Sequence, residues 1–179
     1  IGIAAHAFSK CTKLLLVQMP ETLKFVGSSS FTGCSALETL ILPDSVRNIG
    51  SSAFSKCLSL RSITIPSKIE KVGQYFVEGC ETLTFAEKDG IKYLGNEENP
   101  YIVVVYADKT LKNVILPSTV RVIADSAFKD CIDLVSVSLP AGVVTIENYA
   151  FWGCTALSKI NIPDSVQNIG LASELDKCL

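Results

Sequence analysis

The chain repeats itself every 23 residues, and this period constrains its fold more than any other feature. A phenylalanine stands three residues before five of the in-frame cysteines, and a proline stands nine residues after five of them. One copy is too short to bury its own apolar row, so the copies must stack to form a common core. The in-frame cysteines are Cys11, Cys34, Cys57, Cys80, Cys131 and Cys154.

Within each copy, an alternating apolar segment ends at a proline. Leu40 and Leu42 precede Pro43 in this way, as expected for a short, half-buried strand that stops where the backbone N–H is missing. The rest of each copy is rich in Ser, Gly, Asn and Asp, which favours turns. The pattern therefore predicts a β-rich solenoid of stacked coils, with short parallel strands on one face and irregular turns on the other.

The copy boundaries predict a single solenoid over residues 1–179. From Val72 to Ile123 is 51 residues, two periods plus five, so this stretch must hold one degenerate copy and one copy with an insertion. The chain begins without Met and without a signal-peptide pattern, which predicts a piece of a longer polypeptide. The copies are expected to open at Ile3, Val26, Ile49, Val72, Pro100, Ile123, Ile146 and Ile169.

The insertion is expected at about residues 86–107. Asp89-Gly90 is a tight-turn signal, and Ile102 to Tyr106 is a strand signal. We therefore predict a hairpin-like excursion from Ala86 to Ala107, with a mobile tip at residues 96–99.

The repeated phrase A-F-x-x-C-x-x-L-x-x-I-x-I-P-x-x-V-x-x-I-G, as it stands from Ala53 to Gly73, covers nearly the whole chain. It resembles the BspA-type (Treponema-type) leucine-rich repeat of bacterial and protist surface proteins. The insertion is similar to an interruption found in bacterial members. This resemblance implies a leucine-rich-repeat solenoid, a secreted or cell-surface location, and adhesion or protein binding. It identifies no ligand.

Composition and residue counts lower the prospects of several other functions. The net charge of −2 comes without a basic cluster, so no nucleic-acid partner is expected. The longest uncharged apolar run, Tyr101 to Ala107, is too short for membrane insertion. His6 is the only histidine, and its position in the repeat is variable, which favours a solvent-facing turn over a catalytic base. We therefore expect no enzyme activity, no cofactor and no metal site.

The acidic stretch Asn96 to Glu98, together with Asp89, lacks the spacing of a calcium loop and is expected to be a solvated loop. The cysteines are expected to be reduced and buried. Stacked strands hold equivalent Cβ atoms about 4.8 Å apart, and a disulfide needs roughly 3.5–4.5 Å. Cys178 is one residue out of frame and is expected to be either exposed and reactive or part of a frayed or paired chain end.

Residues that flank the inward strand positions should point outward and form one face. That face is either an extended binding surface or a solvated sheet, and the sequence leaves both readings open. The aromatic rings of Phe85, Tyr93 and Tyr101 either anchor a partner or fill the gap in the degenerate copies. The other candidate contact residues are Leu16, Glu38, Ile41, Arg61, Lys112, Ile115 and Lys159.

The leading hypothesis is a non-catalytic protein-binding or adhesion module of a secreted or cell-surface protein. Its partner would be a host or extracellular-matrix protein. The alternative is a structural spacer that projects other domains and has no ligand of its own. The sequence specifies neither the ligand nor the oligomeric state.

Overall fold

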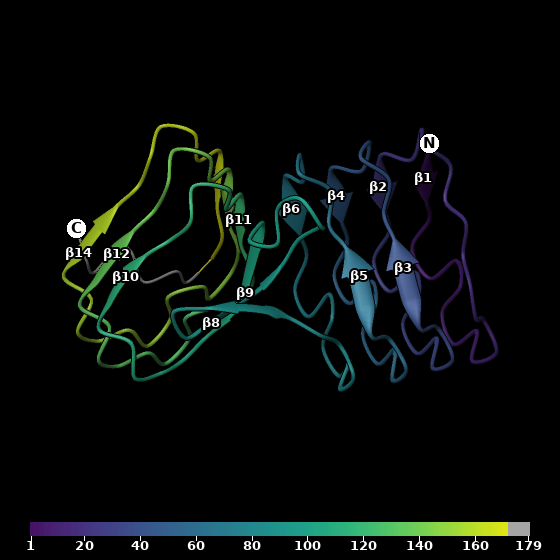
Figure 1. Ribbon diagram of the computed structural model, residues 1–179, viewed down its shortest axis with the longest axis horizontal. Helices are drawn as coiled ribbons and strands as arrows, with labels where there is room; N and C mark the ends of the chain where they lie inside the picture. The colour runs from purple at the N-terminus through teal and green to yellow at the C-terminus, as the bar shows by residue number, and fades with distance from the viewer. Residues whose placement is uncertain (172–179) are drawn as a thin grey trace. The chain divides into compact units, whose positions relative to one another are not determined.

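The computed structural model describes residues 1–171, which form short β-strands joined by turns (Figure 1). No part of this range is helical, so it holds no helix that could cross a membrane. The chain divides into two compact units. The N-terminal unit comprises residues 1–85 and 95–98, and the C-terminal unit comprises residues 86–94 and those from 99 onward. That the two units form one continuous solenoid stays a prediction.

The N-terminal unit contains two parallel sheets whose strands pair at the predicted spacing of 23 residues. In the first sheet, Ile3, Val26 and Ile49 are successive partners, and in the second sheet Leu40 pairs with Ile63. The first sheet has the order β1-β2-β4-β6 and the second the order β3-β5. The strands are β1 Gly2–Ile3, β2 Phe25–Val26, β3 Thr39–Ile41, β4 Asn48–Ile49, β5 Ser62–Thr64 and β6 Lys71–Val72.

The C-terminal unit also contains two sheets. One is parallel, in the order β10-β12-β14, and the other has six strands in the order β15-β13-β11-β9-β8-β7. The copies from Ile123 onward keep the 23-residue register, with Ile123 pairing with Ile146. The strands are β7 Ala86–Lys88, β8 Ile91–Leu94, β9 Val103–Ala107, β10 Asn113–Ile115, β11 Val122–Ile123, β12 Ser136–Ser138, β13 Thr145–Ile146, β14 Lys159–Asn161 and β15 Asn168–Ile169.

The predicted fold class is confirmed, and one feature of it exceeds the prediction. The side of each unit that was expected to hold only turns also carries a ladder of two-residue parallel strands, such as β2, β4 and β6 in the N-terminal unit. The coils approach closely there. A Cβ built on Gly73 would lie 2.3 Å from the Ser51 backbone nitrogen, and one on Gly50 would lie 2.4 Å from the nitrogen of Ser28. Glycine at these two positions lets the backbones approach within hydrogen-bonding distance.

The interruption is an antiparallel meander of β7, β8 and β9, which confirms the hairpin-like excursion. Asp89 and Gly90 form its tight turn, and both have positive φ, +50° and +76°. The tip predicted at residues 96–99 is wrong, because the hairpin turns at Asp89 and Gly90.

The start of the next copy also differs from the prediction. Ile123 pairs with Val104, so the copy opens at Val104 and not at Pro100. From Val104 to Ile123 is 19 residues, four fewer than the period. The apolar run of β9 can donate and accept ladder hydrogen bonds, whereas proline has no N–H to donate.

The phenylalanines stack inside each unit. The rings of Phe31 and Phe54 are 5.8 Å apart and nearly parallel, and those of Phe128 and Phe151 are 5.0 Å apart. All four are buried. Phe8 stacks on Phe31 at 5.1 Å and remains 38% exposed. The repeat therefore builds an aromatic ladder along each core.

The cysteines line the same cores as free thiols. The Cys57 Sγ donates to the Phe31 carbonyl oxygen at 3.2 Å, and Cys34, Cys80 and Cys154 bond equivalent carbonyls at 3.0–3.1 Å. Burial raises the pKa of the Cys34 thiol and keeps it protonated. Each thiol therefore links its coil to the coil before it.

Five in-frame cysteines are buried, as predicted, and Cys11 is exposed. The prediction of six buried thiols is therefore wrong for Cys11. It belongs to the first coil, which has a described coil on one side only. Cys178 lies outside the described residues.

Two positions in each regular copy adopt left-handed backbone. The first is the position of His6, where φ is +61°, and Ser52 has φ +54° at the same place. The second is occupied by glycine in some copies and by larger residues in others, with Gly33 at φ +73° and Lys56 at φ +58°. His6 is therefore an exposed turn residue, as the sequence predicted.

Candidate binding face

The outward strand face consists of the side chains that point away from the core on β3 and β5, and on β10, β12 and β14, together with the residues just before these strands. Alternation along the strands sets it. In β3, Leu40 is buried between exposed Thr39 and Ile41, and β10 repeats the pattern around Val114. In each unit, the strands of this face lie side by side in Figure 1.

The predicted contact residues of this face are all exposed. Leu16 is 64% exposed, Ile41 71% and Ile115 82%, which are high values for large apolar side chains. The charged members are exposed as well, namely Glu38, Arg61, Lys112 and Lys159. Exposure makes these side chains available to a partner, and their role in binding stays a prediction.

In the N-terminal unit, an apolar hollow of about 450 Å³ lies between the first two coils. Leu16, Met19 and Ile41 contribute side chains to it, and Glu21 is its only charged lining residue. It therefore brings together two of the predicted contact residues, Leu16 and Ile41.

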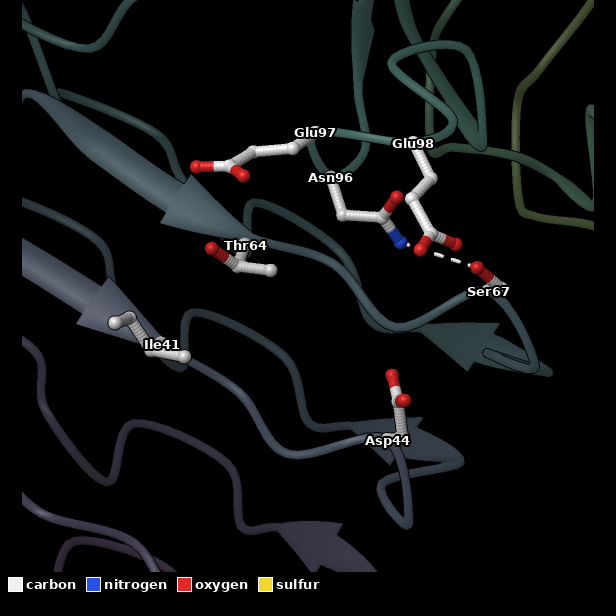
Figure 2. Close-up of a pocket in the computed structure, with 7 residues that line it drawn as sticks. All are labelled: Ile41, Asp44, Thr64, Ser67, Asn96, Glu97 and Glu98. Atoms are coloured by element: carbon white, nitrogen blue, oxygen red, sulfur yellow. Dashed lines mark hydrogen bonds between the residues drawn. The ribbon is translucent and has the colours of Figure 1, made fainter.

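A second hollow of the same unit begins on the other side of Ile41 and has a volume of about 320 Å³. Its lining includes Thr64 and three carboxylates, those of Asp44, Glu97 and Glu98. Figure 2 shows Asp44 and Glu98 pointing toward this space from opposite sides. Because Ile41 lines both hollows, they form one groove, apolar at one end and acidic at the other.

Two of these carboxylates reach the groove through the insertion. The Ile65 N–H donates to the Gly95 carbonyl at 2.8 Å, and the Asn96 amide Nδ2 donates to the Ile65 carbonyl at 3.0 Å. The same Nδ2 also donates to the Ser67 Oγ at 3.1 Å, as the dashed line in Figure 2 shows. These bonds attach the 95–98 segment to the end of β5, so Glu97 and Glu98 stand over the groove.

The C-terminal unit has a hollow of about 340 Å³ over β10, β12 and β14. Lys159 is the only charged residue among its lining, beside exposed Ile115. Much of its polar lining is already paired. The Ser136 Oγ donates to the Asn113 Oδ1 at 2.7 Å, and the Asn161 amide bonds both the N–H and the C=O of Leu139 at 3.0 Å.

The three predicted aromatic residues separate. Tyr93 is only 1% exposed and belongs to the core of the C-terminal unit, so its prediction as a contact residue is wrong. Its ring meets the Tyr101 ring edge-on at 5.1 Å, where the Phe ladder is interrupted. Tyr101 and Phe85 are half-buried and line none of the three hollows.

Some groove residues were not predicted. Asp44 and Ser67 follow the strand prolines at the same position of successive copies, and this recurrence could have identified them. Glu97 and Glu98 were expected in a solvated loop, and both are exposed. Nothing in the repeat indicates their position beside β5, because the insertion has no equivalent in other copies.

The described residues offer little else for chemistry. His6 is exposed in a turn and lines none of the three hollows. Between residues 1 and 171, no group of three or more His, Cys, Asp or Glu side chains is arranged to hold a metal ion. The burial of Tyr93 raises the pKa of its phenol, which marks a core side chain and not a reactive one.

Comparison with known families gives one match. The model of the BspA type leucine-rich repeat region matches residues 1–97 and 104–173 in six copies. The residues left between these ranges fall in the interruption. No curated protein matches the chain.

Solved structures of bacterial leucine-rich-repeat proteins resemble this chain. A leucine-rich-repeat protein of T. pallidum is 31% identical over 95% of this chain, with a TM-score of 0.53. A leucine-rich-repeat protein from Bacteroides ovatus is 28% identical over 95% of this chain, with a TM-score of 0.51. The chain covers 66% of the first protein and 43% of the second, less than two thirds of either.

Proposed function

Because this chain belongs to the BspA-type leucine-rich-repeat family, we propose that it is a non-catalytic protein-binding or adhesion module whose ligand contacts the outward strand face. Leucine-rich-repeat proteins generally bind proteins and are generally non-catalytic. The family also supports a secreted or cell-surface location and a host or extracellular-matrix protein as partner.

The observation that carries this proposal is the exposure of large apolar side chains on hydrogen-bonded strands. Ile41 and Ile115 occupy the same position of their copies, two residues before the strand proline, and both project into solvent from paired strands. Exposed apolar residues in hollows rimmed by polar groups are typical of protein-interaction sites. A rigid strand support lowers the entropy lost on binding.

The test is selection of a random-peptide phage library on the immobilised chain, followed by affinity measurement on variants. We expect the selected peptides to lose affinity for the Ile41→Asn and Ile115→Asn variants. The matched controls are Leu58→Asn and Ile132→Asn. These residues are also exposed and apolar, one in each unit, but they follow the cysteine and lie off the face.

Equal loss in the control variants would contradict binding through this face. Failure of the library to yield any peptide that depends on Ile41 or Ile115 would favour the alternative, a spacer without a ligand of its own.

A further inference from the structure

We propose that the groove of the N-terminal unit binds an extended protein segment in which an apolar side chain lies next to a lysine or arginine. The groove is the pair of hollows that share Ile41. This inference rests on the proposed function, and it specifies the chemistry of the partner.

The apolar part of the segment would occupy the hollow between the first two coils. Leu16 and Ile41 are more than half exposed there, and Met19 adds a flexible wall. Covering this surface removes apolar area from water, at about 25 cal/mol for each Å². Methionine adapts to side chains of different shape, so the hollow selects apolar character more than one particular residue.

The basic residue would occupy the acidic end. Asp44, Glu97 and Glu98 line it, and Glu21 lines the apolar end, so every charged lining residue of the groove is a carboxylate. Among residues 1–171, none of these four carboxylates forms an ion pair with a Lys or Arg of the chain. Their mutual repulsion is therefore relieved by a cation from a partner.

Positive groups of the chain do stand nearby. Arg61 lies on the same face and Lys68 follows Ser67, and both are exposed, yet neither lines the groove. The insertion supplies two of the four carboxylates, and Asn96 holds them at the end of β5 through two hydrogen bonds. The charge of the groove is thus built by a segment that the regular repeat does not contain.

The C-terminal unit provides the contrast. Its hollow has Lys159 and no carboxylate among its lining, while Ile115 repeats the position of Ile41. Asp164 stands where Asp44 stands in its own copy, but it does not line that hollow. A segment that pairs apolar and basic side chains therefore fits the N-terminal groove and not the C-terminal hollow.

The experiment uses the whole chain and synthetic fluorescent peptides of equal length. One peptide alternates isoleucine and lysine, a second replaces lysine with glutamate, and a third replaces isoleucine with serine. Binding is measured by fluorescence anisotropy at low and high NaCl. The variants are Glu97→Gln with Glu98→Gln, and Ile41→Ser. The matched controls are Glu78→Gln with Glu81→Gln, an equal charge change on exposed residues of the same unit, and Ile115→Ser.

We expect the isoleucine–lysine peptide to bind best and to weaken as NaCl rises. Glu97→Gln with Glu98→Gln should weaken its affinity about three- to tenfold, and the two controls should leave it unchanged. Tighter binding of the glutamate peptide, or equal loss in the Glu78 and Glu81 control, would overturn the inference.

The phage selection separates this inference from the proposed function. Peptides that depend on Ile41 but lack basic residues and ignore Glu97→Gln with Glu98→Gln would leave the proposed function standing and overturn the basic partner. No face-dependent peptide at all would overturn both.

Discussion

The N-terminal and C-terminal units use the same repeat but differ at the end of the aromatic ladder and on the outward face. In the N-terminal unit, the ladder of Phe8, Phe31 and Phe54 is continued by Val77 at the same position. In the C-terminal unit, Phe128 and Phe151 stack, and the buried Tyr93 of the antiparallel meander joins the same core. The period thus tolerates an irregular neighbour, provided that it supplies enough apolar volume.

The outward faces differ more than the cores. The groove of the N-terminal unit is apolar and acidic, whereas the hollow of the C-terminal unit is lined by hydroxyl and amide groups with one lysine. Core positions must pack against both neighbouring coils, and outward positions need not. The difference shows that one scaffold can present two unlike surfaces without a change in its register.

The largest effect is expected from Phe54→Ala, which removes a fully buried ring from the middle of the ladder. The unfolding free energy should fall by about 3–5 kcal/mol, and Phe8→Ala should cost less because that ring is partly exposed. Urea unfolding followed by circular dichroism measures this. A loss under about 1 kcal/mol for Phe54→Ala would contradict the ladder.

The same variant tests whether the units unfold together. Trp152 is the only tryptophan and belongs to the C-terminal unit, so its fluorescence reports that unit alone. If the chain is one solenoid, Phe54→Ala shifts both the fluorescence and the circular dichroism transitions. If the fluorescence transition stays in place, the prediction of a single cooperative solenoid is wrong.

A smaller effect is expected where the coils approach most closely. Gly73→Ala would place a Cβ 2.3 Å from the Ser51 nitrogen, and should cost about 1–3 kcal/mol. Ala124 occupies the same repeat position in the C-terminal unit, and Ala124→Gly should cost only about 0.5–1 kcal/mol. Thermal unfolding of the two variants compares them. Equal losses would show that the coil spacing is the same in both units.

Alkaline pH should distinguish the units next. Burial, with the nearby charge of Asp89, raises the pKa of Tyr93 above its ordinary value of 10.0. The unfolded chain then releases the proton first, so stability is complete below pH 10 and falls above it. The slope is up to about 1.4 kcal/mol for each pH unit, the value for one proton.

Tyr93→Phe should remove this alkaline loss, as followed by urea unfolding at pH 8 to 11 with Trp152 fluorescence. Tyr75→Phe is the control, because Tyr75 is 50% exposed and lies in the N-terminal unit. An unchanged pH dependence in Tyr93→Phe would show that its phenol does not titrate with unfolding.

The smallest effect concerns the left-handed corner positions. Lys56 has φ +58° where Gly33 and Gly79 stand in neighbouring copies, so Lys56→Gly should raise the unfolding free energy by about 0.5–1 kcal/mol. Asp130→Gly, at the same position of the C-terminal unit, should gain less, because aspartate tolerates this backbone better. Thermal melts measure both. A loss of stability in Lys56→Gly would mean that its side chain contributes more than the strain.

The sequence by itself determined the features that recur at equivalent positions. A contact between residues 23 apart is written into the period, so the partners of Ile49 in β4, the inward Leu40 and the exposed Ile41 could all be predicted. The Asp89-Gly90 turn was predictable as well, because a tight turn depends on adjacent residues only. Stacking turns such local patterns into the fold.

Only the tertiary structure decided where the interruption packs. Tyr93 enters the core, the next copy opens at Val104, and Asn96 bonds Ile65 to bring Glu97 and Glu98 over the groove. None of these contacts joins equivalent positions, so no repeat could reveal them. They depend on which buried volume and which backbone hydrogen-bonding groups the neighbouring coils leave unsatisfied, and this is known only once the coils have stacked.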